Sequence, residues 1–148
     1  MSMGEREAAM GLITMLIVLG LFLWRITGQA EAGLFDGPGA LQTWARSVLV
    51  LVAWSIGIAI AVAIGFHILY AIITGEKPDE RRDERDRDID RRALTWSWHL
   101  LSFGLLGVIV DLALGSSAFR AMNLVLALCM LSEFFKDGLK LWLYRRGA

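Results

Sequence analysis

The segment SVLVLVAWSIGIAIAVAIGFHILYAIIT, residues 47–74, contains no charged side chain. A helix crosses the hydrocarbon core of a bilayer with about 20 mostly apolar residues, and this segment is longer than that. A soluble surface helix would alternate apolar and polar faces, which this segment does not. The segment therefore predicts a transmembrane helix, and it decides the class of the whole fold.

Three more apolar runs accompany it, at residues 8–24, 93–114 and 118–144. The run 93–114 is interrupted only by Asp111, whose expected partner is Arg120 across the short turn that follows. With 56 % hydrophobic residues and a mean hydropathy of +0.55, the chain is too apolar for an ordinary soluble domain. No cleavable signal peptide is indicated, because mixed charges rather than a basic segment precede the first run.

The predicted fold class is all-α: an integral membrane four-helix bundle that forms a single domain over residues 1–148. The charged segment between the second and third long runs is expected to extend the third helix out of the membrane and into the cytoplasm. The expected helices cover about 8–26, 44–74, 78–114 and 117–145, with external loops at 27–43 and 115–117.

Half of the charged side chains lie in one segment, residues 76–92, which contains eight acids and seven bases. Short cytoplasmic loops retain Lys and Arg, so this segment and the basic stretch at 140–146 are expected on the cytoplasmic side. Four crossings then place both termini in the cytoplasm. The expected location is the cell (inner) membrane, with the helices in contact with the lipid bilayer.

The charged segment is predicted to be helical. Pro78 suits a first helical turn, and the acids and bases after it recur at three- or four-residue spacing. Two interpretations are open: a solvated, salt-bridged helix end, or a surface that binds a cytoplasmic protein partner. The alternating signs are expected to leave no basic face, which argues against nucleic acid as a partner. The candidate interaction residues are Asp83, Glu84, Arg85, Arg87, Asp88, Arg91 and Arg92.

Two short stretches carry a resemblance to a protein family: DERDRDIDRRA, residues 83–93, and YRRG, residues 144–147. The sequence resembles a family of uncharacterised small bacterial and archaeal integral membrane proteins. Its members have four predicted helices, a D-E-R-D-x-x-I-x-x-R-A segment before the third helix, and a Y-R-R-G end. The resemblance implies this topology, and it implies no activity because the family has no established one.

The second helix carries a small residue at every fourth position. Small side chains at this spacing let two helix backbones approach closely in lipid. The pattern predicts either a seam between copies of the chain, and hence a homo-oligomer, or an ordinary contact inside the bundle. The small-residue ridge consists of Ala53, Gly57, Ala61 and Gly65.

The two histidines of the chain, His67 and His99, are expected at nearly the same depth near the cytoplasmic side. On the fourth helix, Glu133 and Asp137 share one face and reach the same level. Such a layer can hold a divalent metal, ligate haem b between two imidazoles, or conduct protons or cations. The competing interpretation is structural, because lysines three residues after each carboxylate, Lys136 and Lys140, can neutralise both acids.

No nucleophile motif or phosphate loop is present, and Cys129 is expected far in depth from both histidines, so no enzyme is predicted. The leading hypothesis is a non-enzymatic membrane protein that presents the charged helix 79–92 for protein interaction or regulation. The alternative is a metal- or haem-binding, or a proton- or cation-conducting, bundle that uses His67 and His99.

Overall fold

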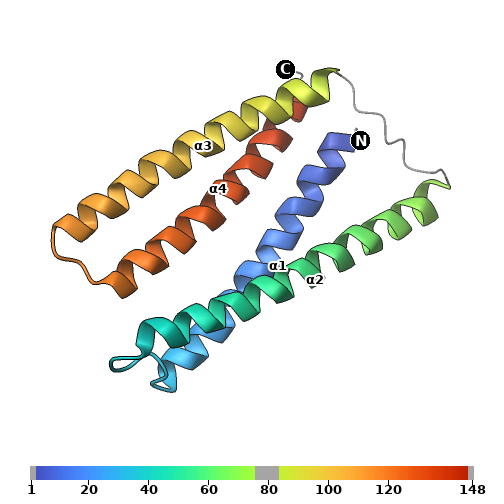
Figure 1. Cartoon of the computed structure of the whole chain (residues 1–148). Helices are drawn as coiled ribbons and strands as arrows, with labels where there is room; N and C mark the ends of the chain where they lie inside the picture. Colours follow the sequence, from blue (N-terminus) through green and yellow to red (C-terminus); the bar gives the residue numbers. More distant parts are fainter. Residues whose placement is uncertain (1–2, 76–83, 147–148) are drawn as a thin grey trace.

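The computed structural model describes residues 3–75 and 84–146, and the regular structure in these ranges is helical. Figure 1 shows long helices that run up and down through the molecule. Both chain termini and the start of the third helix lie at one end, which we call the charged end, and two short connections lie at the other, the loop end. The helices are α1 (Met3–Glu31), α2 (Ala40–Thr74), α3 (Glu84–Ala113) and α4 (Ala118–Arg146).

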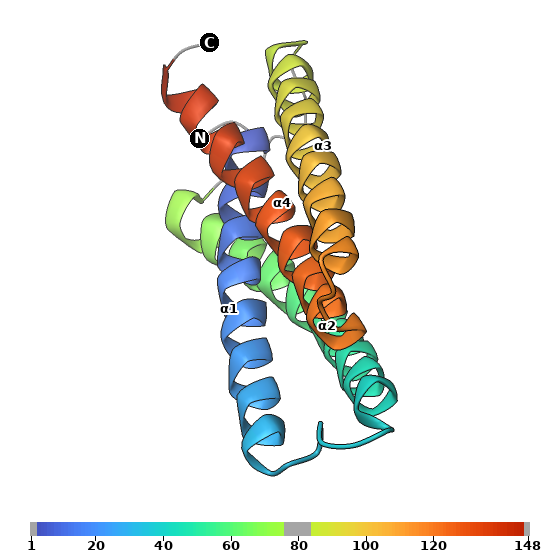
Figure 2. The same ribbon diagram turned by 90° about the vertical axis from the view of Figure 1, so that its left-hand side faces the viewer.

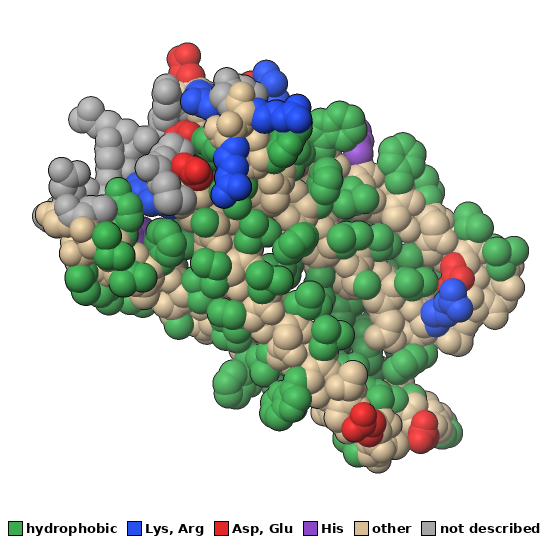
Figure 3. All heavy atoms as spheres, turned by 180° about the vertical axis from the view of Figure 1, so that it is seen from behind, with side chains coloured by type: hydrophobic (Ala, Val, Ile, Leu, Met, Phe, Trp, Pro, Cys, Tyr) green, Lys and Arg blue, Asp and Glu red, His purple; other side chains and the backbone are tan. Residues whose placement is uncertain are grey.

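All four helices are long and apolar enough to cross a membrane. Large apolar side chains cover their outer surfaces, and Figure 3 shows them spread over one face of the molecule while charged side chains gather mainly at one end. A helix satisfies its own backbone hydrogen bonds, so such a surface is stable against lipid tails. The predicted all-α four-helix fold is confirmed, and the chain is a multi-pass membrane protein.

The connection between α1 and α2 is shorter than predicted. It covers residues 32–39 instead of 27–43, because both helices continue beyond their apolar runs. Gly28 stays inside α1, and the chain turns at Gly33 and Gly37, whose φ angles of 70° and 92° are rarely adopted by other residues. Gly28 does not end α1, because only the glycines after the helix adopt a positive φ.

α1 begins at Met3, five residues before the predicted start, whereas the end of α2, the end of α3 and both ends of α4 lie within one residue of the predictions. α3 is continuous from Glu84 through its charged start into the membrane span, whereas the predicted start at residue 78 lies outside the described residues. The connection at 114–117 makes α3 and α4 antiparallel neighbours. Across it, Nε of Arg120 lies 3.3 Å from Oδ2 of Asp111, which confirms the predicted ion pair.

The helices pack in the order α3, α4, α1 and α2 instead of forming a closed square. α4 is central, with α3 on one side and α1 on the other, and α2 packs mainly on α1. Figures 1 and 2 show α3 beside α4 and α2 crossing α1 at an angle. Within the described residues α2 and α3 do not pack against each other.

The seam between α3 and α4 sets the register of the charged end. Oγ of Ser132 donates a 3.0 Å hydrogen bond to the carbonyl of Ser97, and both residues are buried. A Cβ built at Gly104 would lie 3.0 Å from Cδ1 of Leu128 and 3.2 Å from its Cγ, so the bare glycine lets the two helices approach. This register brings the charged start of α3 against the last turns of α4.

Candidate functional site

Residues 84–92, the charged start of α3, do not form a free rod, because their inner face packs against α4. Asp86 is 5 % exposed and accepts a 2.9 Å hydrogen bond from the hydroxyl of Tyr144. About one turn later, Asp90 forms a 2.7 Å ion pair with Lys140, and both side chains are largely shielded from solvent. Two of the acids in the segment therefore fasten α3 to α4.

The outer face of residues 84–92 is predominantly basic. Glu84 and four arginines are exposed. Asp88 is half-buried and is bound by Arg91 at 3.0 Å and by Arg92 at 2.7 Å. The expectation that alternating signs leave no basic face is therefore wrong, because two of the four acids turn inward and four arginines outnumber the two acids left outside. This outer face, called the arginine face below, consists of Arg85, Arg87, Arg91 and Arg92.

α1 closes the charged end from the other side. A Cβ at Gly4 would lie 2.8 Å from Cζ of Tyr144, so α1 approaches the tyrosine that holds α3. Arg6 is 7 % exposed, and its guanidinium carbon lies 4.7 Å from the ring centroid of Tyr70 on α2. Of the predicted interaction residues, Asp83 lies outside the described residues. The others form an exposed surface on a packed, three-helix base.

The predicted layer of His67, His99, Glu133 and Asp137 is not brought together. The histidines lie on α2 and α3, which do not contact each other, and both side chains are exposed. Nδ1 of His67 donates instead to a backbone carbonyl of its own helix, at 2.7 Å. In the ranges that the structure describes, no group of three or more His, Cys, Asp or Glu side chains could hold a metal ion. Residues expected at one depth need not meet, because depth does not determine which helices are neighbours.

The small-residue ridge of α2 faces away from the bundle. Its members Ala53, Gly57, Ala61 and Gly65 are all exposed. A Cβ at either glycine would meet nothing within 4 Å, so no other helix of the chain packs there. The interpretation of the ridge as a contact inside the bundle is therefore wrong. Self-association through the ridge stays a prediction.

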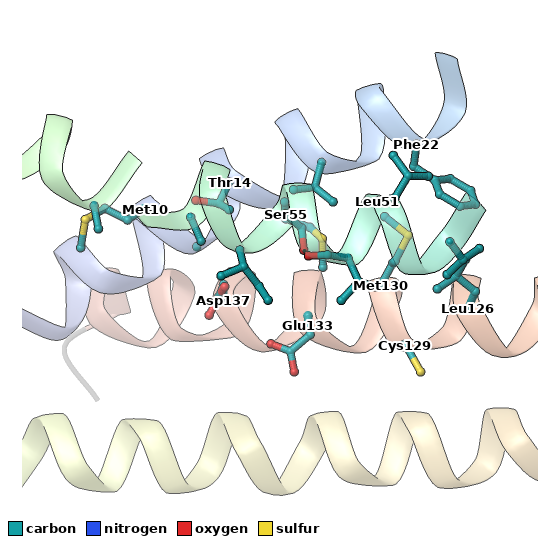
Figure 4. A pocket seen from close by; sticks show the side chains of 18 residues that line it. Met10, Thr14, Phe22, Leu51, Ser55, Leu126, Cys129, Met130, Glu133 and Asp137 are labelled. Carbon is teal, nitrogen blue, oxygen red and sulfur yellow. Dashed lines mark hydrogen bonds between the residues drawn. The ribbon is translucent and has the colours of Figure 1, made fainter. Parts of the chain in front are cut away.

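A cavity of about 670 Å³ lies among α1, α2 and α4. Its walls are mainly apolar, and Figure 4 shows Met10 and Phe22 of α1 and Leu51 of α2 among the side chains that line it. The volume falls in the range of small-molecule sites. Two carboxylates of α4, Glu133 and Asp137, also line it. No pattern in the sequence indicates this cavity, because the cavity depends on how three helices cross.

The two carboxylates have different surroundings. Glu133 forms an ion pair with Lys136, as predicted, and in Figure 4 it extends from α4 away from α1 and α2. Asp137 lies against α1, where a Cβ at Gly11 would be 2.8 Å from its Cγ. Lys140, its expected partner, pairs with an acid of α3 instead. Within residues 3–75 and 84–146, Asp137 accepts no hydrogen bond and forms no ion pair.

Comparison with known proteins adds no relative from which a function could be transferred. The resemblance carried by residues 83–93 and 144–147 stays a prediction. No protein-family model matches the sequence, and neither a curated protein nor a solved structure is significantly similar to it.

Proposed function

We propose that this chain is a non-enzymatic protein of the cell (inner) membrane whose charged end lies in the cytoplasm and binds an acidic partner protein. The observation that carries this proposal is the sorting of charge on residues 84–92. Two of the four acids, Asp86 and Asp90, turn toward α4. The arginines are all exposed and outnumber the two acids that remain on the outer face, Glu84 and Asp88. A helix end that only has to stay solvated needs no such sorting, because acids and bases exposed in equal number are equally soluble.

The arginine face is held rigidly. On the opposite side of the helix, Asp86 and Asp90 are bound to Tyr144 and Lys140 of α4. Ile89, which lies between these two acids in the sequence, is 2 % exposed. A preformed surface loses less conformational entropy when a partner binds than a flexible one does. Complementary charge on the partner would then act through specificity and encounter rate.

The position of the arginines favours a protein partner over lipid headgroups. The apolar run of α3 begins at Ala93, and Arg91 and Arg92 directly precede it. Measured from Ala93 at 1.5 Å per residue, Arg87 and Arg85 lie about 9 and 12 Å further out along the helix axis. The headgroup layer is only about 5 to 7 Å thick on each side of the bilayer. The outer half of the arginine face therefore extends beyond the headgroups.

Arg87 offers the sharpest test, because it is exposed and pairs with no residue in the described ranges. Arg87→Glu, in the full chain in nanodiscs, should weaken binding of a fluorescent oligoglutamate peptide by about three- to tenfold. An exposed charge pair contributes up to about 1 kcal/mol, and reversal replaces attraction with repulsion. Fluorescence anisotropy measures the affinity, which should also fall as salt is raised.

The matched control is Arg46→Glu, the same charge reversal at an exposed position of α2 near the loop end. In cells, a photoreactive residue at position 87 should cross-link to a protein, and Arg85→Glu with Arg91→Glu in the same chain should abolish the adduct. Equal peptide affinity of the Arg87 and Arg46 variants would contradict the proposal. Adducts with lipid alone would assign the arginine face to headgroups instead.

The alternative, a metal, haem or cation-conducting site at His67 and His99, has less support. The two side chains are exposed on helices that do not pack together in one chain. An absorbance spectrum and elemental analysis of the purified protein test it directly. A haem band or stoichiometric metal that disappears in His67→Ala would favour this alternative.

A further inference from the structure

We infer that the cavity among α1, α2 and α4 binds an amphiphile with a single cationic headgroup. The headgroup pairs with the carboxylate of Asp137, and the apolar chain lies along α1 in the interior of the membrane. This site is separate from the arginine face. It does not depend on whether a partner protein binds there.

Asp137 lies at the level where the apolar interior begins. Lys140 pairs with Asp90 across the antiparallel seam, so Asp137, three residues before Lys140, lies level with Ala93, the first residue of the apolar run of α3. On the other side Asp137 lies against Gly11, which follows closely after Glu7, the last charge before the apolar run of α1. A headgroup at this carboxylate would sit at the boundary between the polar and apolar layers, where amphiphiles place their charge.

Within the described residues Asp137 forms no ion pair, although Lys136 and Lys140 lie near it, because Lys136 is engaged by Glu133 and Lys140 by Asp90. A carboxylate at this depth is costly unless a cation or hydrogen-bond donor meets it directly. A cationic headgroup provides that direct partner. A zwitterionic phospholipid would bring its phosphate beside the same carboxylate, so the geometry favours a free amphiphile with one positive charge.

The shape of the cavity suits an elongated apolar chain. The lining runs from Met10 to Phe22, about 18 Å along α1 at 1.5 Å per residue. Thr14 and Ser55 are the uncharged polar side chains that Figure 4 labels, and the remaining wall is largely aliphatic. Methionines such as Met130 adapt to chains of different shape. Lipid tails alone could fill this space, but they would leave Asp137 without a partner.

The test measures equilibrium binding of radiolabelled dodecyltrimethylammonium to the full chain in phosphatidylcholine nanodiscs. Saturable binding of one molecule per chain is expected. Asp137→Asn should lower the affinity by about tenfold or more, because it removes a charged partner that the headgroup contacts directly. Asp111→Asn is the matched control, the same acid-to-amide change on a carboxylate outside the cavity that is paired with Arg120. It should change the affinity less than about twofold.

A second variant keeps the test independent of how well Asp137→Asn folds. Ala59 lines the cavity from α2, and Ala59→Phe should fill it and lower the affinity while Asp137 is retained. Equal binding of Asp137→Asn and Asp111→Asn, or no saturable binding to the wild type, would overturn the inference. Binding of uncharged dodecanol as tight as that of the cation would overturn the headgroup assignment. Displacement by phosphatidylethanolamine in the nanodisc would assign the site to a membrane lipid.

Discussion

Gly11→Ala should lower the affinity of the cavity for a cationic amphiphile while leaving the cavity itself in place. The added Cβ would lie 2.8 Å from Cγ of Asp137 and closer still to its Oδ2. Ordinary contacts between heavy atoms begin at about 3.5 Å, so the carboxylate must withdraw from α1 by roughly 1 Å. The methyl group also takes up part of the space next to the carboxylate that a headgroup would occupy.

The size of the effect follows from the charge separation. At an effective dielectric constant of about 20, opposite charges about 4 Å apart attract by about 4 kcal/mol, and at about 5 Å by about 3.3 kcal/mol. Losing about 0.8 kcal/mol weakens binding by about fourfold. This loss should be smaller than that of Asp137→Asn, which removes the charge altogether.

The measurement is the same nanodisc binding assay, with Gly20→Ala as the matched control. Gly20 lies on the same helix, and a Cβ there would meet nothing within 4 Å. Both variants gain the helix preference of Ala over Gly, about 1 kcal/mol in water, so that contribution cancels. Equal affinities of the two variants would refute the idea that the carboxylate over Gly11 provides the counter-charge.

Two further substitutions test the packing on which both sites rest. Gly104→Ala should lower the free energy of unfolding by about 1 to 3 kcal/mol relative to Gly107→Ala, measured by SDS titration in mixed micelles. Only the first Cβ would meet Leu128, whereas a Cβ at Gly107 would meet nothing within 4 Å. Asp90→Asn should free Lys140 to reach Asp137 at three-residue spacing, and so lower the affinity of the cavity for the cation by about two- to fivefold. An unchanged affinity would show that Lys140 does not govern that carboxylate.

Hydropathy predicted the number and type of the helices because the bilayer requires long apolar runs whatever their neighbours are. It placed the first connection wrongly, since Gly28 looks like a helix breaker in the sequence but stays inside α1. The turn comes at Gly33 and Gly37. A glycine's φ is set by the path of the chain, which its neighbours in sequence do not reveal.

Which helix ends lie together could be predicted from the sequence, whereas lateral neighbours could not. His67 and His99 were expected to meet, yet α2 packs on α1 and not on α3. The position of α2 also involves contacts with α4 at the loop end, where the ring of the buried Trp44 lies 6.2 Å from that of Phe119. Contacts of this kind join segments far apart in the chain and leave no local pattern.

The inward turn of the acids did have a signal in the sequence. Ile89 is the one apolar residue within 84–92, and residues 86, 89, 93 and 97 follow the three- and four-residue spacing of a single helix face. Reading Ile89 as a buried position would have placed Asp86 on the inner face beside it. The identity of the partners still required the structure, because Tyr144 and Lys140 come from the far end of the sequence.

The ion pair between Lys140 and Asp90 connects the two proposed sites. Along α4 alone, each carboxylate has a lysine three residues later, so the sequence predicts a balanced row of charges. The structure keeps the pair of Glu133 with Lys136 but gives Lys140 to Asp90 on α3. That exchange turns Asp90 inward, so arginines outnumber acids on the outer face of residues 84–92. It also engages the lysine that was expected to pair with Asp137, so that carboxylate lines the apolar cavity without an ion pair to any described residue.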